Sequence, residues 1–418
     1  MKILHINISD VEGGATRAAY RIHKALLKEG IDSQMLVHSK GSDDYTVQTV
    51  WKTKLGAIFK FLRPYLDVLP IKKYKNRTKT TFSAAWVPFS KVVDRINEIN
   101  PDIVHLHWIC GGMLRIEDLA KIKQPIVWTL HDMWAFTGGE HYDEGQAHYT
   151  EKCGNSKVLN SHKENDLSRK GWERKNKTYQ RIKSLNIIAP SRWLYNESKK
   201  SSLLKDKPHY LLPYVLDTNI FKPLDKNIAR DLWYLPKDKK LILFGALNAT
   251  GDKRKGYDLL LAALKQLKRE DVEIIVFGSS APKEKSDLPF KIHYTGRLYD
   301  DISLVTLYSC ADVMIAPSRQ DNLVQTALES ICCGTPVVAF NTTGQPDIID
   351  HKINGYLAQP FDSEDLKNGI EWVLDNENYE SLSKNAREKA INHFAEGVNT
   401  PKQIEIYKEI LNSVASKS

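Results

Sequence analysis

The sequence has few of the residues that mark secreted, membrane-spanning or zinc-binding proteins. It contains five cysteines in 418 residues, an odd number without zinc-type spacing, which favours a reducing compartment. No stretch approaches the roughly 20 apolar residues that cross a bilayer. The N-terminal "MKILHINIS" reads as a strand and lacks the long apolar core and cleavage site of a signal peptide. We therefore expect a cytoplasmic protein.

Low-complexity segments, internal repeats and a strong charge imbalance are also missing. The net charge is +9, a moderate basic excess that could serve nucleic acid, a membrane surface or an anionic ligand. The length suffices for two domains, each with a sizeable core.

Strands and helices alternate in both halves of the chain. In the first half, "KILHINI", "IDSQMLVHS", "PDIVHLHW", "QPIVWTLHD" and "LNIIAPS" read as strands, and the first helix has Ala18, Ile22, Ala25 and Leu26 on one face. The stretch "KDKPHYLLPYVLDTNIFKP" has three prolines and no helical period, so we place a linker there. The alternation then restarts, which predicts two α/β domains with parallel sheets, residues 1–208 and 209–398.

Several polar and glycine residues follow directly after predicted strands, where open parallel sheets bind ligands. "EGGATR" places Gly14 before a helix, where glycine backbone approaches an anion, although a plain tight turn explains it too. "DKRKGYDLL" places Arg254 and Lys255 before another helix and suits a diphosphate, the alternative being a solvated basic loop. The three-glycine dinucleotide fingerprint is absent from "EGGATR", which argues against a nicotinamide cofactor. His131 in "WTLHDMW" could donate to a sugar hydroxyl or could be a packed core histidine.

Two carboxylates lie eight residues apart in "SRQDNLVQTALESICCGTPVVAF". Asp321 ends a loop after a predicted strand, and Glu329 lies two turns along the next helix, near the same face. The backbone N–H groups of Asn322 and Leu323 at the helix start suit a phosphate. A carboxylate facing a buried site needs partners, and ribose hydroxyls are suitable ones.

This stretch resembles the acidic-x7-acidic motif of retaining glycosyltransferases of family 4, which have the GT-B fold. "EGGATRAAYRIHKAL", "FGALNATGDKRKGYDLLLAAL" and "TGQPDIIDHKINGYLA" resemble further parts of the same family, and "TLHDMWAFTGG" resembles its bacterial polysaccharide-synthesis branch. The order and spacing of these motifs make the resemblance specific over most of the chain. It implies two Rossmann-like, doubly wound domains facing a central cleft, with a C-terminal helix over residues 399–418 that crosses back to the N-terminal domain.

The resemblance also implies roles for individual residues in holding a nucleotide sugar, UDP- or GDP-linked. Arg254 and Lys255 would bind the diphosphate, and Glu329 the ribose. Asp321 with the backbone of Asn322 and Leu323 would contact the donor sugar. From the other domain, His131 would hydrogen-bond that sugar, and Gly14 would face the phosphates or the acceptor. We expect no cofactor and no metal, because cations and helix termini can neutralise the diphosphate.

The sequence departs from its relatives at several positions. Many have glutamate where Asp321 stands, and the branch often has proline where Val324 stands. Gly245–Ala246 replaces a Gly-Arg pair, a charge that Arg254 could supply. Relatives often carry four cysteines after "FTGG", where this chain has Glu140, Gln146, Cys153 and Ser156. One thiol cannot make a structural zinc site, so we predict no metal there.

Residues 51–82 form an unusually basic segment. They carry nine Lys or Arg and one acidic residue, Asp67, with aromatic residues interleaved. Leu55, Ile58, Phe59 and Leu62 fall at helical spacing, which suits an amphipathic segment on an anionic membrane at the inner face of the cell. A solvated lysine-rich insertion is the main alternative, and a nucleic-acid surface is disfavoured because the enzyme motifs already account for an anionic ligand.

The function implied by the resemblance is retaining, metal-independent transfer of a hexose. The donor is a nucleotide sugar and the acceptor a saccharide, expected to be lipid-linked, in cell-surface polysaccharide or lipopolysaccharide synthesis. Two alternatives remain open from the sequence. One is a sugar-nucleotide epimerase or phosphorylase on the same fold, and the other is a non-catalytic sugar-nucleotide-binding protein.

Overall fold

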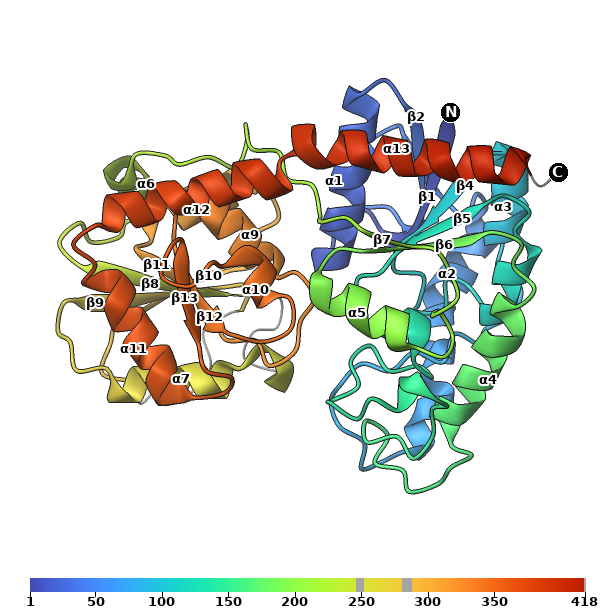
Figure 1. Ribbon diagram of the computed structural model, residues 1–418, viewed down its shortest axis with the longest axis horizontal. Coiled ribbons are helices and arrows are strands. Elements are labelled where there is room, and N and C mark those ends of the chain that lie inside the picture. The colour runs from blue at the N-terminus through green and yellow to red at the C-terminus, as the bar shows by residue number, and fades with distance from the viewer. Residues whose placement is uncertain (246–251, 280–287, 417–418) are drawn as a thin grey trace. The chain divides into compact units, whose positions relative to one another are not determined.

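The computed structural model describes residues 1–245, 252–279 and 288–416. Residues 246–251, which include Ala246 and part of the stretch resembling a phosphate-binding region, lie outside the described residues. The chain divides into two compact units, unit 1 (Met1–Val215 with Asn399–Ser418) and unit 2 (Leu216–Val398). Each unit is a parallel sheet with helices packed on it (Figure 1). The predicted fold class, two Rossmann-like α/β domains, is confirmed.

The sheet of unit 1 has seven parallel strands in the order β3-β2-β1-β4-β5-β6-β7. The five strands predicted from the sequence are all present. The two added strands, β3 and β7, are three-residue edge strands, too short to show an alternating pattern. The strand bounds are β1 Lys2–Ser9, β2 Asp32–Ser39, β3 Val47–Thr49, β4 Ile103–Leu106, β5 Ile126–Thr129, β6 Leu185–Ala189 and β7 His209–Leu211.

The helices of unit 1 follow the strands in the chain and cover the sheet. In α1 the predicted apolar face is confirmed, because Ala18, Ile22, Ala25 and Leu26 are all buried. Gly13 precedes this helix with φ of 95°, a backbone conformation that residues other than glycine rarely adopt. The helix bounds are α1 Gly14–Lys28, α2 Lys54–Asp67, α3 Val92–Ile99, α4 Leu167–Tyr179 and α5 Arg192–Lys200.

Unit 2 repeats the doubly wound pattern with six parallel strands in the order β10-β9-β8-β11-β12-β13. The central strands are almost entirely apolar and buried, as expected for a sheet covered on both faces. The strands are β8 Lys240–Gly245, β9 Val272–Phe277, β10 Ile292–Gly296, β11 Val313–Ala316, β12 Val337–Phe340 and β13 Gly355–Ala358. The helices are α6 Lys226–Leu232, α7 Tyr257–Gln266, α8 Asp301–Cys310, α9 Gln325–Cys332, α10 Gln345–Ile348, α11 Ser363–Leu374 and α12 Tyr379–Phe394.

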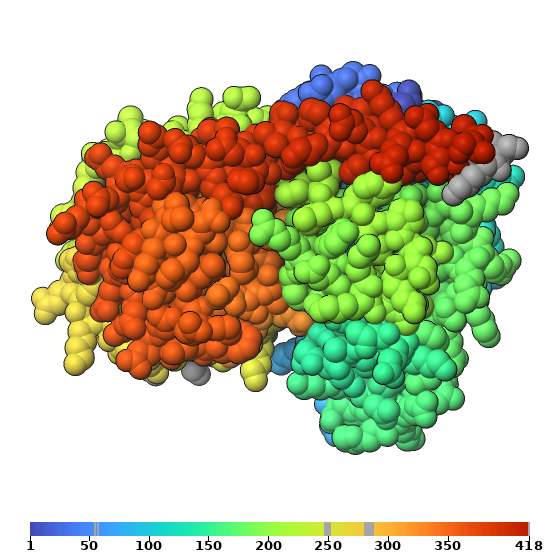
Figure 2. Space-filling model, viewed as in Figure 1, coloured from blue at the N-terminus to red at the C-terminus, as the bar shows by residue number. Residues whose placement is uncertain are grey.

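The last helix, α13 (Glu396–Ala415), belongs to unit 1 from Asn399 onward. Tyr407 is fully buried there, and its hydroxyl lies 2.6 Å from Nδ1 of His105 on β4. Ile410 packs in the same apolar cluster as residues of β1 and β4. The opposite side of the helix, coloured red, is exposed in Figure 2. Among the described residues, no helix combines the length and the apolar character needed to span a membrane.

Helix α2 lies within the amphipathic segment expected over residues 51–82, and the predicted apolar residues Ile58, Phe59 and Leu62 are exposed on it. Arg63 and Asp67 face inward and are 3% and 2% exposed, whereas Phe59 and Phe61 face outward and are 58% and 66% exposed. The inward face is satisfied by hydrogen bonds, because the Arg63 guanidinium donates to the carbonyls of Val87, Pro88 and Gly112. The helix therefore buries Arg63 and Asp67 and exposes apolar residues, the reverse of a globular surface helix.

Candidate functional site

The predicted phosphate-binding cations lie on a tight turn in unit 2. Residues Lys253–Lys255 form a single 3₁₀ turn that ends at Gly256, which has φ of 71° and begins α7. A Cβ atom at Gly256 would lie 1.9 Å from the carbonyl oxygen of Pro317. Only glycine allows this approach, and it brings the turn against the loop that follows β11. The backbone hydrogen bond from Arg319 N to Arg254 O, 2.8 Å, ties the two segments together.

The loop after β11 brings a carboxylate to both cations. Lys255 Nζ lies 2.5 Å and Arg254 Nη1 3.1 Å from the same oxygen of Asp321, Oδ2. The other oxygen accepts from the backbone N–H of Asn322 at 3.1 Å. Arg254 also pairs with Asp252 at 3.0 Å. The structure therefore brings Arg254, Lys255, Asp321 and Asn322 together, four of the six predicted residues in this unit.

The two cations of this cluster, Arg254 and Lys255, are balanced by the carboxylates of Asp252 and Asp321. Burial lowers the pKa of Lys255, and Asp321 opposes that effect. Both side chains stay partly exposed, 18% for Lys255 and 11% for Asp321. Within the described part of the chain, the Lys255 ammonium makes one hydrogen bond, to Asp321, and an ammonium has three N–H donors. An incoming phosphate could therefore be bound without breaking the ion pair.

Glu329 is held deeper in unit 2, on α9. It is 2% exposed, and its Oε2 accepts a 2.7 Å hydrogen bond from the hydroxyl of Tyr308 on α8. The sequence did not single out Tyr308, because 21 residues separate the pair and no local pattern links them. Leu323 is also buried, 4% exposed, just before α9. A carboxylate this buried needs hydrogen-bond donors, and Tyr308 is one.

Replacing Glu329 with glutamine is expected to weaken nucleoside diphosphate binding several-fold while the fold survives. Glutamine keeps an oxygen that accepts from Tyr308 but loses the charge that strengthens bonds to ribose hydroxyls. Isothermal titration with UDP and GDP, together with the melting temperature, measures both effects. Glu380→Gln, at an exposed position on α12, is the matched control. Unchanged affinity with a lower melting temperature would make Glu329 a purely structural residue.

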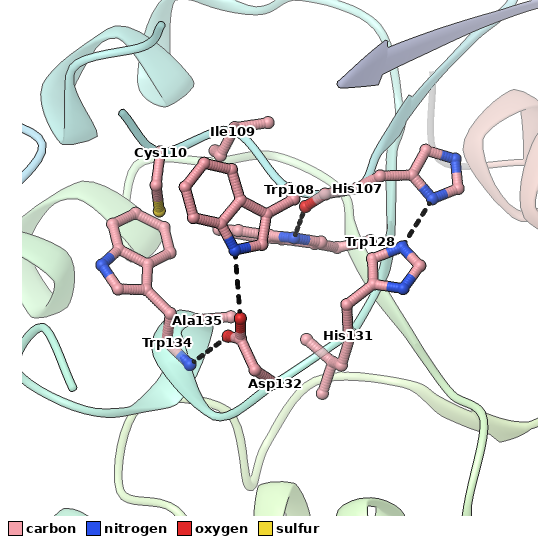
Figure 3. Close-up of a pocket in the computed structure, with 10 residues that line it drawn as sticks. His107, Trp108, Ile109, Cys110, Trp128, His131, Asp132, Trp134 and Ala135 are labelled. Carbon is pink, nitrogen blue, oxygen red and sulfur yellow. Dashed lines mark hydrogen bonds between the residues drawn. The ribbon is translucent and has the colours of Figure 1, made fainter. Parts of the chain in front are cut away.

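His131 lies in unit 1, two residues after β5, and is 9% exposed. Its Nε2 lies 3.0 Å from Nδ1 of His107, and its Nδ1 lies 2.8 Å from the hydroxyl of Tyr214. The ring also stacks on Tyr214, with centroids 5.5 Å apart. Beside it is a cavity of about 10 Å³ lined by residues of the segments after β4 and β5 (Figure 3). The protein thus engages both nitrogens of the predicted sugar-binding histidine.

A chain of hydrogen-bonded imidazoles continues from His131 into the core. His107 Nε2 lies 2.9 Å from His5 Nδ1, so the three rings form one line, of which Figure 3 shows the His107–His131 link. Because a neutral imidazole donates from one nitrogen and accepts at the other, the tautomers of all three are coupled. Burial lowers the pKa of His131 to about 4, with Asp132 opposing it, and lowers the pKa of His107 well below its usual value. The rings are therefore neutral near pH 7.

Acidification is expected to destabilise unit 1 through these histidines. Their folded pKa values lie below the unfolded value of about 6.5, so the unfolded chain binds more protons as the pH falls. Stability is full above pH 6.5 and declines toward pH 4, by up to about 1.4 kcal/mol per pH unit for each histidine. Urea unfolding at pH 7.5 and 5.5 measures the slope. His105→Gln should reduce it, because burial lowers the pKa of His105 to about 3; exposed His162→Gln should leave it unchanged.

Gly14 is exposed at the start of α1, just beyond the carboxyl end of β1. This is the sheet edge where ligands of doubly wound domains bind.

Asp132, the residue after His131, is a further charged group that the sequence did not single out. Its carboxylate accepts from Trp108 Nε1 at 3.1 Å and pairs with His141 at 2.6 Å. Burial alone would raise the pKa of Asp132, but His141, the backbone N–H of Trp134 and His131 together lower it. Asp132 is thus a charged anchor beside His131.

Two groups of side chains in unit 1 have the composition of a metal site. One is His5, His105 and His107, and the other is Glu140, His148 and Cys153. In each group the ligand atoms lie within 4.8 Å of one another. The prediction of no metal at the second group rested on the four positions where relatives often carry cysteine, only one of which is a cysteine here. His148 is not one of those four positions, so the prediction did not consider it.

Comparison with known proteins agrees with the fold and the motifs. A family model described as Glycosyltransferase Family 4 matches residues 12–218, and one described as Glycosyl transferases group 1 matches residues 226–389. A D-inositol 3-phosphate glycosyltransferase of Saccharomonospora viridis is 30% identical over 220 residues, 47% of this chain and 49% of the relative. An uncharacterised glycosyltransferase of Methanocaldococcus jannaschii is 26% identical over 205 residues, 47% of this chain and 51% of the relative. The chain thus matches about half the length of these curated relatives.

Solved structures match over nearly the whole chain. Sucrose-phosphate synthase from Thermosynechococcus elongatus superposes with a TM-score of 0.68 at 17% identity, covering 99% of both chains. Anabaena HepE, solved with UDP-glucose, superposes with a TM-score of 0.63 at 17% identity, covering 100% of both chains. At such identity these likenesses show the fold alone, whereas the two family models between them match most of the sequence. The chain belongs to the GT-B glycosyltransferases of the group 1 and family 4 superfamily.

Proposed function

We propose that this protein is a retaining glycosyltransferase that moves a hexose from a nucleotide diphosphate donor to a saccharide hydroxyl. The observation that carries the proposal is the cluster of Arg254, Lys255 and Asp321 at the carboxyl ends of β8 and β11. Two cations beside helix N-termini suit a diphosphate. Glu329 would bind the ribose, and no metal or cofactor is required.

The proposed reaction transfers the sugar with retention of its anomeric configuration. The acceptor hydroxyl attacks the anomeric carbon on the face that the nucleoside diphosphate leaves. As the bond from that carbon to the diphosphate oxygen breaks, the diphosphate takes the hydroxyl proton. Arg254 and Lys255 would stabilise the negative charge that develops on the leaving group. His131 would hydrogen-bond the transferred sugar by exchanging its contact with the Tyr214 hydroxyl for one with a sugar hydroxyl.

The donor and acceptor classes rest on similar proteins. HepE is solved with UDP-glucose, and WaaG, a similar structure with a TM-score of 0.63, is described as involved in lipopolysaccharide biosynthesis. We therefore propose a UDP- or GDP-sugar donor and a lipid-linked saccharide acceptor in cell-surface polysaccharide synthesis, on the cytoplasmic side of the membrane.

A ligand screen tests the proposed function directly. Thermal shifts with UDP, GDP and ADP, followed by their sugars, identify the donor. A true donor at 100 times its dissociation constant stabilises the folded protein by about 2.7 kcal/mol. Transfer to a saccharide lipid, with the anomer assigned by NMR, then tests retention. Release of a free sugar or an epimer without acceptor would support the epimerase alternative, and formation of a sugar phosphate that requires added inorganic phosphate would support the phosphorylase alternative. Binding without turnover would support a binding protein.

Helix α2 supports a second part of the proposal, contact with an anionic membrane. Its outward face carries exposed Ile58, Phe59, Phe61 and Tyr65, and exposed Lys72, Lys73, Lys75 and Arg77 follow it in the chain. Apolar side chains can enter the lipid interface while the cations bind anionic headgroups.

Binding to vesicles is expected to rise with anionic lipid and to fall with salt. Each basic residue near the surface contributes about 1 kcal/mol, screened beyond roughly 8 Å at physiological ionic strength. Changing Lys72, Lys73, Lys75 and Arg77 to serine should release the protein from vesicles, as should Phe59→Ser with Phe61→Ser. Transfer to a soluble acceptor should remain near normal in both variants. A wild-type protein that ignores anionic vesicles at low salt contradicts the membrane proposal.

A further inference from the structure

A long irregular segment of unit 1 connects the 3₁₀ turn Trp134–Phe136 to α4. It covers residues 137–166, and its regular structure consists of one 3₁₀ turn, His148–Thr150. In Figures 1 and 2 it belongs to the turquoise-to-green loops at the lower end of unit 1. Irregular connections of this length are uncommon in compact domains and usually serve a function.

Three potential metal ligands from this segment converge. The carboxylate of Glu140, an imidazole nitrogen of His148 and the thiol of Cys153 lie within 4.8 Å of one another. The side chain of His148 is 9% exposed, and Glu140 and Cys153 are fully buried. His148 Nε2 lies 3.8 Å from Glu140 Oε1. That distance is close to the roughly 3.4 Å edge of a tetrahedron with bonds of about 2.1 Å, as in zinc sites.

Two buried polar atoms of this group have no hydrogen-bond partner among the described residues. They are Oε2 of Glu140 and Nε2 of His148. His148 Nδ1 lies 3.2 Å from the carbonyl oxygen of Gly154, to which it can only donate. The proton is thereby placed on Nδ1, and Nε2 presents a lone pair toward Glu140. Metal-ligating histidines are typically oriented by such a bond from their second nitrogen.

Of the polar neighbours of Glu140, Ser156 orients its carboxylate, whereas Lys175 directs its hydrogen bonds to other groups. The hydroxyl of Ser156 donates to Glu140 Oε1 at 2.6 Å. The buried ammonium of Lys175 donates instead to the backbone carbonyls of Trp134 and Thr137. Glu140 thus keeps one buried oxygen, Oε2, with no hydrogen-bond donor among the described residues, which is the arrangement expected of a metal ligand.

We propose that Glu140, His148 and Cys153 bind one divalent transition-metal ion of the zinc class. As the ion binds, the Cys153 thiol releases its proton to solvent, and the carboxylate and the thiolate then balance the charge of the dication. Sulfur, nitrogen and oxygen ligands of this kind suit zinc, and Ser156 holds the carboxylate in place. The ion would fasten the irregular segment and takes no part in the proposed sugar transfer.

The second group, His5, His105 and His107, is a poorer site. Three neutral imidazoles would leave the full charge of a dication buried. Both nitrogens of His105 and of His107 are also already within hydrogen-bond distance of other residues. Binding there would break the imidazole chain that leads to His131.

Cobalt binding tests the proposal on the full-length protein. After treatment with a chelator, titration with Co²⁺ should produce a thiolate-to-cobalt absorption band that saturates near one ion per chain and is reversed by Zn²⁺. Cys153→Ser should abolish the band. His148→Gln should weaken Co²⁺ binding by about 100-fold or more. His162→Gln, an exposed histidine of the same segment, should bind as the wild type does.

Absence of the band in the wild-type protein overturns the proposal, and so does a His148→Gln variant with wild-type Co²⁺ affinity. If Cys153→Ser fails to fold, the wild-type titration and His148→Gln still decide the question. The readout is absorbance and stoichiometry, so it is separate from nucleotide binding. A chain that binds nucleotide but no Co²⁺ would keep the proposed function and lose this site.

Discussion

Replacing His131 with alanine is expected to lower the rate of sugar transfer by about 100-fold or more. When Nδ1 of His131 exchanges the Tyr214 hydroxyl for a sugar hydroxyl, alanine removes one hydrogen bond to the transition state, and such a loss typically costs this much. Nucleoside diphosphate affinity should stay within about twofold, since the proposed diphosphate ligands, Arg254 and Lys255, belong to unit 2. Steady-state kinetics with the donor found in the ligand screen, together with titration of the nucleotide, separates the two effects.

The buried surroundings of His131 make a structural control necessary. Alanine also leaves His107 without one hydrogen-bond partner and removes the stacking on Tyr214. Tyr214→Phe removes only the hydroxyl that lies 2.8 Å from His131 Nδ1, so the imidazole stays in place. If His131 contacts the sugar, Tyr214→Phe should keep most of the activity. Equal losses of rate and melting temperature in both variants would show that His131 only supports the fold.

Replacing Lys255 with alanine is expected to weaken nucleoside diphosphate binding by about 10- to 150-fold. This corresponds to roughly 1.5–3 kcal/mol, the typical strength of a charge-assisted hydrogen bond. The fold should survive, because Arg254 still pairs with Asp321 at 3.1 Å. Isothermal titration with the nucleotide identified in the ligand screen measures the change.

The neighbouring lysine provides a matched control for Lys255. Lys253 lies two residues earlier on the same turn and is exposed, so Lys253→Ala removes an equal charge outside the cluster. Its affinity should change little at physiological ionic strength, where exposed charges are screened. Equal losses in the two variants would mean that the turn acts through general positive charge. No loss in either would remove Lys255 from the proposed site.

Local patterns predicted the secondary structure and failed where tertiary contacts set the burial. Apolar runs separated by helical patterns located the strands other than the short β3, β7 and β13, because period and turn chemistry act over a few residues. Helix α2 shows the limit. The spacing of Ile58, Phe59 and Leu62 predicted an outward apolar face, and all three are exposed, but no local pattern predicted that Arg63 and Asp67 are buried. Arg63 is buried because its guanidinium donates hydrogen bonds to the carbonyl oxygens of residues 87, 88 and 112, which are distant in the sequence.

By itself, the sequence determined two parallel-sheet domains and the residues that follow their strands, among them Gly14, His131 and Asp321. Only the tertiary structure decided which distant side chains meet. Lys255 pairs with Asp321 66 residues away, and His5 lies beside His107 at a separation of 102 residues. Glu140, His148 and Cys153 share no recognisable ligand spacing and still converge. The physical reason is that periodicity reports each segment's own geometry, whereas these contacts depend on how strands are ordered in the sheet and where the backbone permits close approach.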